Sequence, residues 1–158
     1  MIVYRIAKTD YVRDLSGIGA RLYGGRWSPP GIPVVHASEN RALAVLEFYV
    51  HASRRFIPPG LSIASIEISG NVSVKNIVIS DLPPDWKEYP APTALQDIGR
   101  AWVKSADGLL LRVPSAQVAS EHNILINPSH PEIVNVRIKE VVDFAYDRRL
   151  MVQQKTVR

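Results

Sequence analysis

Short runs of apolar residues, some of them alternating with polar ones, recur along the chain and predict β-strands. Strands are expected over residues 2–6, 33–37, 61–68, 72–79, 109–113, 124–126 and 133–138. Residues 69–71, a Ser-Gly-Asn turn sequence, join the third and fourth of these strands. The hydrophobic pattern therefore predicts six or seven strands.

Residues 39–53 place apolar side chains three or four positions apart, as one face of a helix requires. The expected buried stripe consists of Ala42, Leu43, Leu46, Tyr49 and Val50. Ser38 precedes this stripe and is the expected N-cap, because a serine hydroxyl can accept a hydrogen bond from a free N–H of the first turn. Arg54 and Arg55 follow the stripe, where basic side chains suit the end of a helix.

A second helix is expected over residues 93–106, opened by a capping box of Thr93 and Gln96. Residues 15–33 and 80–92 are rich in glycine or proline and are expected to form loops. Because the strands are not strictly separated by helices, the pattern favours an α+β fold over a doubly wound parallel sheet.

The length of 158 residues fits a single domain that spans residues 1–158. The chain contains no cysteine, which excludes disulfides, thiolate nucleophiles and cysteine-ligated zinc. No apolar run approaches the roughly 20 residues of a transmembrane helix, and Arg5 interrupts the N-terminus before a secretory signal core can form. A soluble cytoplasmic protein without a membrane partner is expected.

The formal net charge is +4, and the surplus lies in the first third of the chain. Residues 1–55 carry eight Lys or Arg and four Asp or Glu. This excess suits an anionic ligand, an acidic partner or nucleic acid, although a plain solvated surface explains it equally well. No basic stripe interleaved with aromatic residues occurs, so direct contact with nucleic acid is not expected.

Residues 24–27, Gly-Gly-Arg-Trp, form the first candidate ligand motif. Gly25 would let a ligand approach the backbone closely, and Arg26 could offer a bidentate fork to phosphate or carboxylate. Trp27 could anchor the segment in the core. The alternative is a rigid turn with a surface arginine. No P-loop, dinucleotide-binding glycine motif, nucleophile elbow or zinc-protease motif is present.

Glu47 and His36 are candidates for chemistry. Glu47 borders the apolar stripe of the first predicted helix, where a carboxylate can be partly desolvated, although a surface glutamate fits the same position. His36 follows Val35 on a predicted strand and points to the opposite face. A histidine there can stack on a planar ring or transfer a proton, or it can be a satisfied core residue.

Ser115 and Asn127 follow predicted strands, where polar groups often face a cleft. Either side chain could donate a hydrogen bond to a ligand, and turn capping is the alternative. His122 and His130 lie eight residues apart without a cysteine nearby, so no metal site is expected.

Taken together, these segments resemble the RES-domain family, the toxin halves of bacterial Xre–RES toxin–antitoxin pairs. The resemblance runs in order through residues 3–7, 15–20, 24–27, 33–39, 42–47, 82–86, 98–102, 113–116, 127–131 and 144–150. It implies an ADP-ribosyltransferase-like fold, which is a split mixed β-sheet with flanking helices. Two departures are present: the family commonly has Tyr where this chain has His36, and often has Asn at Ser28.

The resemblance also implies an enzyme that degrades NAD⁺ as its substrate, without a cofactor or a metal, and an Xre antitoxin as protein partner. A homodimer is a further possibility. The family's functional Arg, Glu and Ser fall on Arg26, Glu47 and Ser115.

On this reading, Arg26 clamps the NAD⁺ phosphates with Arg5 as a second cation. Glu47 stabilises the oxocarbenium-like ribose, and His36 holds the nicotinamide. Ser115 and Asn127 hydrogen-bond the ligand. Water or phosphate as acceptor gives a glycohydrolase or a phosphorylase. The alternatives are an ADP-ribosyltransferase that modifies a macromolecule, and a catalytically degenerate binding module.

Overall fold

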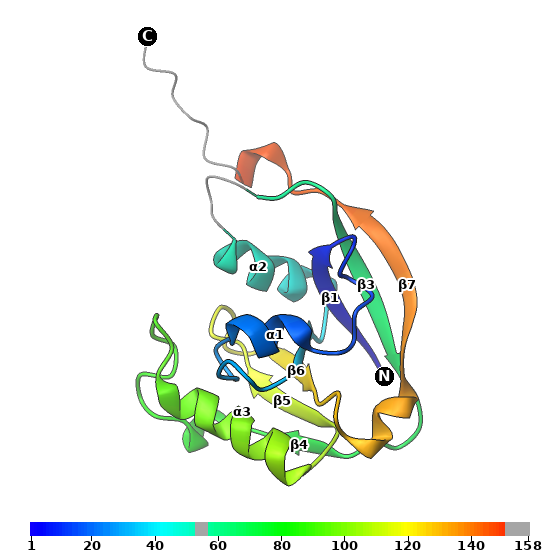
Figure 1. The fold of residues 1–158 in the computed structure, drawn as a ribbon. Helices are drawn as coiled ribbons and strands as arrows, with labels where there is room; N and C mark the ends of the chain where they lie inside the picture. The colour runs from blue at the N-terminus through cyan, green and yellow to red at the C-terminus, as the bar shows by residue number, and fades with distance from the viewer. Residues whose placement is uncertain (53–56, 151–158) are drawn as a thin grey trace.

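The computed structural model describes residues 1–52 and 57–150 (Figure 1). The strands are β1 (Ile2–Lys8), β2 (Val35–Ser38), β3 (Leu61–Ile68), β4 (Val74–Asn76), β5 (Leu110–Pro114), β6 (His122–Ile126) and β7 (Val136–Phe144). The helices are α1 (Ile18–Tyr23), α2 (Arg41–His51) and α3 (Thr93–Ser105), with short 3₁₀ turns at Ile79–Asp81, Pro131–Asn135 and Arg148–Leu150. The predicted α+β class is confirmed.

The seven strands of the described residues form one mixed sheet in the order β4-β5-β6-β2-β1-β3-β7. β4 and β5 are parallel and the other neighbours are antiparallel. β1 pairs with β3 along its whole length, from Ile2↔Glu67 to Lys8↔Leu61. By contrast, β1 meets β2 at one pair, Tyr4↔Ser38. The sheet therefore splits between β1 and β2, as the family resemblance implied.

Two apolar cores cover different parts of the sheet. The core beside α3 gathers Trp27, Trp86, Leu95, Trp102, Leu111, Val113 and Leu125. The core beside α2 gathers Ile6, Ala44, Leu61, Ile63 and Tyr146. In Figure 1, α2 lies toward the β1 and β3 part of the sheet and α3 toward the β4 and β5 part. A third cluster, which includes Val12, Ile66 and Ile124, completes the interior.

Several predicted boundaries were wrong. Residues 15–33 were expected to be a loop, but residues 18–23 form α1. The fourth strand is shorter than expected, and it pairs with β5 rather than with its neighbour in sequence, β3. The last strand begins at Val136 and extends to Phe144, because a 3₁₀ turn occupies residues 131–135.

Both predicted helix caps were also wrong. The N-cap of α2 is Asn40, whose Oδ1 accepts a hydrogen bond from the Leu43 N–H at 2.8 Å. α3 has Pro92 at its N-cap and no side-chain cap bond. On α2, Leu43 and Ala44 are buried, whereas Ala42 of the predicted stripe is exposed. The predicted end of this helix at Ser53, with Arg54 and Arg55 after it, lies outside the described residues.

No helix among the described residues has both the length and the apolar character needed to span a membrane.

Candidate active site

A pocket of about 390 Å³ opens where β1 and β2 diverge, between the α3-side and α2-side cores. Its volume lies within the roughly 300–1,000 Å³ typical of small-molecule sites. The polar side chains that line it are Tyr4, Arg5, Arg26, His36, Ser38, Glu47, His51 and Asn123. Among the described lining residues, Glu47 carries the one carboxylate, whereas Arg5 and Arg26 carry two guanidinium groups.

The turn that contains Arg26 is held by its own backbone and by α3. Gly24 takes a φ of +70°, which a side chain would disfavour, and the Gly25 N–H donates to the Ser28 carbonyl at 2.7 Å. From α3, the Gln96 amide donates to the Gly25 carbonyl at 3.0 Å. Trp27 is buried in the α3-side core. This local rigidity fixes where the Arg26 side chain leaves the backbone.

Gly25 lies against the ring of His36. A Cβ at this glycine would stand 3.4 Å from His36 Cε1 and 3.5 Å from Nε2. A side chain longer than one carbon would therefore occupy space beside the ring. The absence of a side chain at Gly25 keeps this part of the pocket wall open.

Arg26 reaches from this turn to residues 86–88. Its Nη1 donates to the Trp86 carbonyl at 2.7 Å and its Nη2 donates to the Glu88 carbonyl at 3.3 Å. Partial burial lowers the pKa of the guanidinium, and the negative charge of Glu47 opposes that shift. The arginine is thus a fixed cation within electrostatic reach of the carboxylate.

Glu47 projects from α2 into a hydrogen-bonded set of polar side chains. Its Oε1 accepts hydrogen bonds from the Ser115 hydroxyl at 2.7 Å and from Asn123 Nδ2 at 2.6 Å. The Ser38 hydroxyl in turn donates to Asn123 Oδ1 at 2.7 Å. Segments far apart in sequence therefore orient one carboxylate oxygen.

Ser115 lies behind Glu47 rather than on the pocket wall. It is fully buried, and its Oγ accepts hydrogen bonds from the N–H groups of Gln117 and Val118 at 3.0 and 3.2 Å. The residue is both a turn cap and a donor to Glu47. Its predicted contact with the ligand is replaced by a contact with the carboxylate, because no open space adjoins its hydroxyl.

Asn127 does not join the other candidates. Its side chain is buried away from the pocket wall. Its Nδ2 donates to the Val103 carbonyl at 3.4 Å and its Oδ1 accepts from the Ser129 N–H at 3.0 Å. Both ends of the amide serve local structure, so the structure does not bring Asn127 to the site.

His36, Arg5 and His51 line the same pocket. The ring of His36 is open to the cleft, yet the surrounding protein disfavours its charged form. Desolvation, followed by the positive charges of Arg5 and His51, lowers the pKa of His36 to about 4. Burial also lowers the pKa of Arg5, which Asp14 opposes, and the guanidinium donates to the Asp14 carbonyl.

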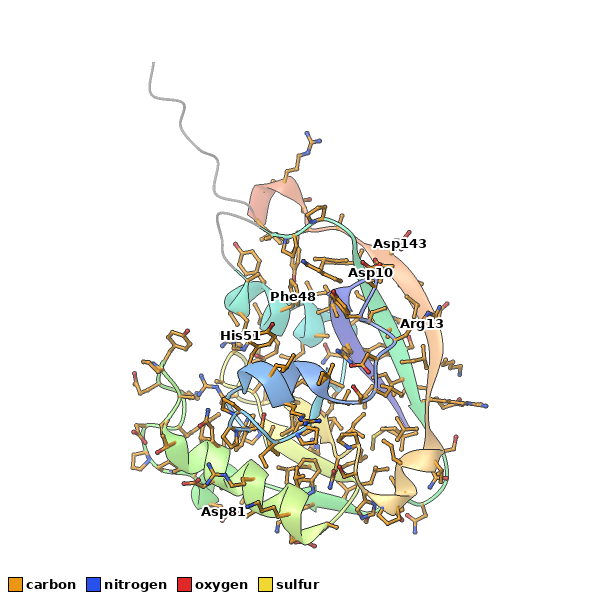
Figure 2. All side chains as sticks on the ribbon, in the orientation of Figure 1. Asp10, Arg13, Phe48, His51, Asp81 and Asp143 are labelled. Atoms are coloured by element: carbon orange, nitrogen blue, oxygen red, sulfur yellow. The ribbon has the colours of Figure 1, made fainter. Side chains whose placement is uncertain are left out.

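Sequence reasoning missed several of the lining residues, among them Tyr4, Phe48, His51 and Asn123. His51 stands one helical turn after Glu47, so helical spacing could have indicated it. Figure 2 labels Phe48 and His51 at α2, the helix that supplies both side chains to the pocket wall. Asn123 has no such local signal, because it depends on the pairing Ser38↔Asn123 between β2 and β6.

Comparisons with known proteins agree with this architecture. A family model described as "RES domain" matches residues 2–147. "Toxin Res" of Photorhabdus laumondii is 35% identical over 157 residues, covering 98% of this chain and all of that protein. "Prs ADP-ribosylating toxin" of a Sphingobium species is 37% identical over 147 residues, covering 92% of this chain and 91% of that one.

A solved structure shares the fold. The crystal structure of the M. tuberculosis MbcT–MbcA toxin–antitoxin complex contains a chain with a TM-score of 0.73 to this one. The identity is 19%, and the match covers 90% of this chain and 83% of that one.

Proposed function

This chain belongs to the RES domain family, and from that premise we propose that it is the toxin of a toxin–antitoxin pair whose pocket binds NAD⁺ and cleaves the nicotinamide–ribose bond. The observation that carries the proposal is that Arg26 and Glu47 line the same pocket. Residues 21 positions apart in sequence place a fixed cation and an oriented carboxylate on one pocket of suitable size. NAD⁺ combines an anionic pyrophosphate with a ribose that becomes positively charged as the bond breaks.

The two charges have separate tasks. Arg26, with Arg5 as a second cation, binds the pyrophosphate. As the bond from the ribose C1′ to the nicotinamide nitrogen breaks, its electron pair leaves with nicotinamide, which departs as a neutral molecule. Glu47 stabilises the positive charge that develops on the ribose, or orients the acceptor whose oxygen then bonds to C1′. The acceptor loses its proton to solvent.

The remaining side chains shape the pocket and orient the ligand in it. His36, neutral at pH 7 because its pKa is about 4, holds the nicotinamide ring without placing a second positive charge beside the cationic pyridinium. Gly25 and Trp27 form the wall against which the ligand lies. Ser115 acts through Glu47, to which it donates a hydrogen bond.

The test is chromatography of NAD⁺ incubated with the purified chain, with and without inorganic phosphate. Loss of NAD⁺ with release of nicotinamide is expected, and its dependence on phosphate separates phosphorolysis from hydrolysis. Arg26→Ala and Glu47→Gln should each lower the rate by about a hundredfold or more. Glu140→Gln, on the exposed surface of β7, is the matched control. Full activity in Arg26→Ala or Glu47→Gln, at an unchanged circular dichroism spectrum, would contradict the role of that residue.

A second function is transfer of ADP-ribose to a macromolecule. The observation that favours it is the relative named as an ADP-ribosylating toxin, which matches nearly the whole chain. Incubation of a cell extract with the chain and tagged NAD⁺ would then leave the tag on a macromolecule. Release of all the tag as small molecules would leave cleavage of NAD⁺ as the activity.

We also infer an antitoxin partner, since the structural neighbour was solved as a toxin–antitoxin complex. The family resemblance makes an Xre-type protein the expected partner. Co-expression with the product of an adjacent reading frame should relieve growth arrest and yield a complex that co-purifies. Growth arrest that persists with every neighbouring reading frame co-expressed would contradict this partner.

A further inference from the structure

Asn123 lies at the pocket wall on β6 and makes the shorter of two hydrogen bonds to the Glu47 side chain. Its Nδ2 is 2.6 Å from Glu47 Oε1, and Ser115 Oγ is 2.7 Å from the same oxygen. A carboxylate that accepts two hydrogen bonds on one oxygen has lost most of its freedom to rotate. The two hydrogen bonds therefore restrict the orientation of the Glu47 carboxylate in the pocket.

The asparagine amide is hydrogen-bonded at both of its ends. An amide has a donor end and an acceptor end, and the Glu47 carboxylate, which can only accept, takes the donor end, Nδ2. The Ser38 hydroxyl donates to the acceptor end, Oδ1, at 2.7 Å. The antiparallel register of β2 and β6 places Ser38 opposite Asn123, so the sheet itself delivers the orienting group.

The direction of the Ser115 hydroxyl is determined by two further hydrogen bonds. Its oxygen accepts from the N–H groups of Gln117 and Val118, which leaves its hydrogen to point at Glu47. Within the described part of the chain, Glu47 Oε2 accepts no hydrogen bond from a side chain. The carboxylate is therefore presented to the pocket by one oxygen, while the other is held by two oriented donors.

We propose that Asn123, oriented by Ser38, is a positioning residue that holds Glu47 with Oε2 free for the substrate. The proposal rests on the proposed function, because it assigns Asn123 a task in the same reaction. A residue with this task lowers kcat when it is lost and leaves the KM for NAD⁺ unchanged, since it acts on the carboxylate and not on the bound ligand.

The sharpest test is Asn123→Asp, which keeps the size of the side chain and replaces the N–H donor by an oxygen. At neutral pH two carboxylates then face each other, and kcat should fall by about ten- to a hundredfold, as expected for a lost hydrogen bond to a charged group. Ser38→Ala, which removes the orienting hydroxyl alone, should lower kcat by about three- to tenfold. Asn76→Ala, on the exposed surface of β4, is the control and should behave as the wild type.

The pH dependence separates positioning from a merely structural role. Two adjacent carboxyl groups raise each other's tendency to hold a proton. As the pH falls from about 8 to about 5, the pair in Asn123→Asp takes up one proton, and the resulting O–H restores a hydrogen bond to Glu47. The ratio of kcat in Asn123→Asp to kcat in the wild type should therefore rise on acidification. The other charged or titratable groups of the pocket, Tyr4, Arg5, Arg26, His36 and His51, are common to both proteins.

A second readout does not depend on turnover. The carboxyl ¹³C resonance of Glu47, identified by its absence in Glu47→Gln, should change its chemical shift in Asn123→Asp, which loses the N–H donor to this carboxylate, and keep it in Asn76→Ala. A wild type that consumes NAD⁺ together with an Asn123→Asp variant that matches Asn76→Ala in kcat and in this resonance would overturn the inference. A wild type that consumes no NAD⁺ would overturn the proposed function instead, and the resonance alone would then decide whether Asn123 holds Glu47.

Discussion

The protonation state of His36 affects the net charge of the pocket. An ordinary histidine titrates near pH 6.5, whereas here desolvation and the charges of Arg5 and His51 lower the pKa to about 4. The imidazole is consequently neutral at physiological pH. This matters for a ligand with a cationic ring, because a charged imidazole would repel it while a neutral ring can stack on it.

The lowered pKa has a consequence for stability. Between about pH 4 and pH 6.5 the unfolded chain binds a proton at this histidine and the folded chain does not. The contribution of His36 is therefore fully present above about pH 6.5 and is lost as the pH falls toward 4. His36→Tyr, with the residue common in the family, should reduce the loss of stability on acidification. Urea denaturation at about pH 7.5 and 5 measures this difference, and equal losses in both proteins would contradict it.

At the residue scale, the sequence could indicate Arg26, His36 and Glu47 because each stands in a recognisable local pattern. The structure brings these three to one pocket with Arg5, Gly25 and Trp27. Asn123 could not be found in that way, since its contact with Glu47 depends on the register of two strands 85 residues apart. Ser115 and Asn127 shared the same local signal, a polar residue after a strand, and only Ser115 reaches Glu47.

Helices α2 and α3 illustrate how tertiary contacts override local capping rules. Ser38 had the composition of a cap, but its hydroxyl bonds Asn123, and Asn40 caps α2 instead. Gln96 completed the spacing of a capping box, but its amide bonds the Gly25 carbonyl. In both helices the side chain expected to close the helix end is used to build the pocket. Local spacing predicted both helices, and the start of α3 at Thr93, but not the residues that cap them.

Helix α3 packs directly against the Arg26 turn at Gly99. A Cβ at this position would stand 1.7 Å from the Trp27 carbonyl oxygen, so Gly99→Ala must push the helix away from the turn. Overpacking of this kind costs about 1–3 kcal/mol, more than the ~1 kcal/mol that alanine adds to helix propensity. The free energy of unfolding should fall, and NAD⁺ consumption should fall with it because Arg26 moves.

Gln96→Ala is expected to perturb the same turn less than Gly99→Ala does. It removes one hydrogen bond to the same turn, worth about 0.5–1.5 kcal/mol, and inserts no atom. Gly99→Ala should therefore lower both the free energy of unfolding and the rate of NAD⁺ consumption more than Gln96→Ala does. A Gly99→Ala protein that is as stable and as active as the wild type would show that α3 does not position the turn.

For the whole molecule, the decisive feature is the split of the sheet between β1 and β2. Arg26 comes from the turn anchored in the α3-side core, whereas Arg5 and Glu47 belong to β1 and α2 beside the other core. The strand and helix content that led to an α+β prediction was readable from apolar periodicity. The strand order was not, because β4 pairs with β5 across a long loop and α3 rather than with β3.

A ligand that contacts both parts should stabilise the folded chain. ADP-ribose, the part of NAD⁺ that remains after nicotinamide leaves, keeps the pyrophosphate for Arg26. At about 100 times its Kd it should add ~2.7 kcal/mol, which corresponds to a rise in Tm of about 5–10 °C for a chain of this size. Arg26→Ala should lose most of this rise at the same concentration. Arg100→Ala, which removes an exposed arginine on α3 that does not line the pocket, should keep this rise in Tm because it leaves the phosphate contact intact. A full rise in Arg26→Ala, measured by thermal unfolding, would place the pyrophosphate on other cations of the pocket, with Arg5 the first to substitute.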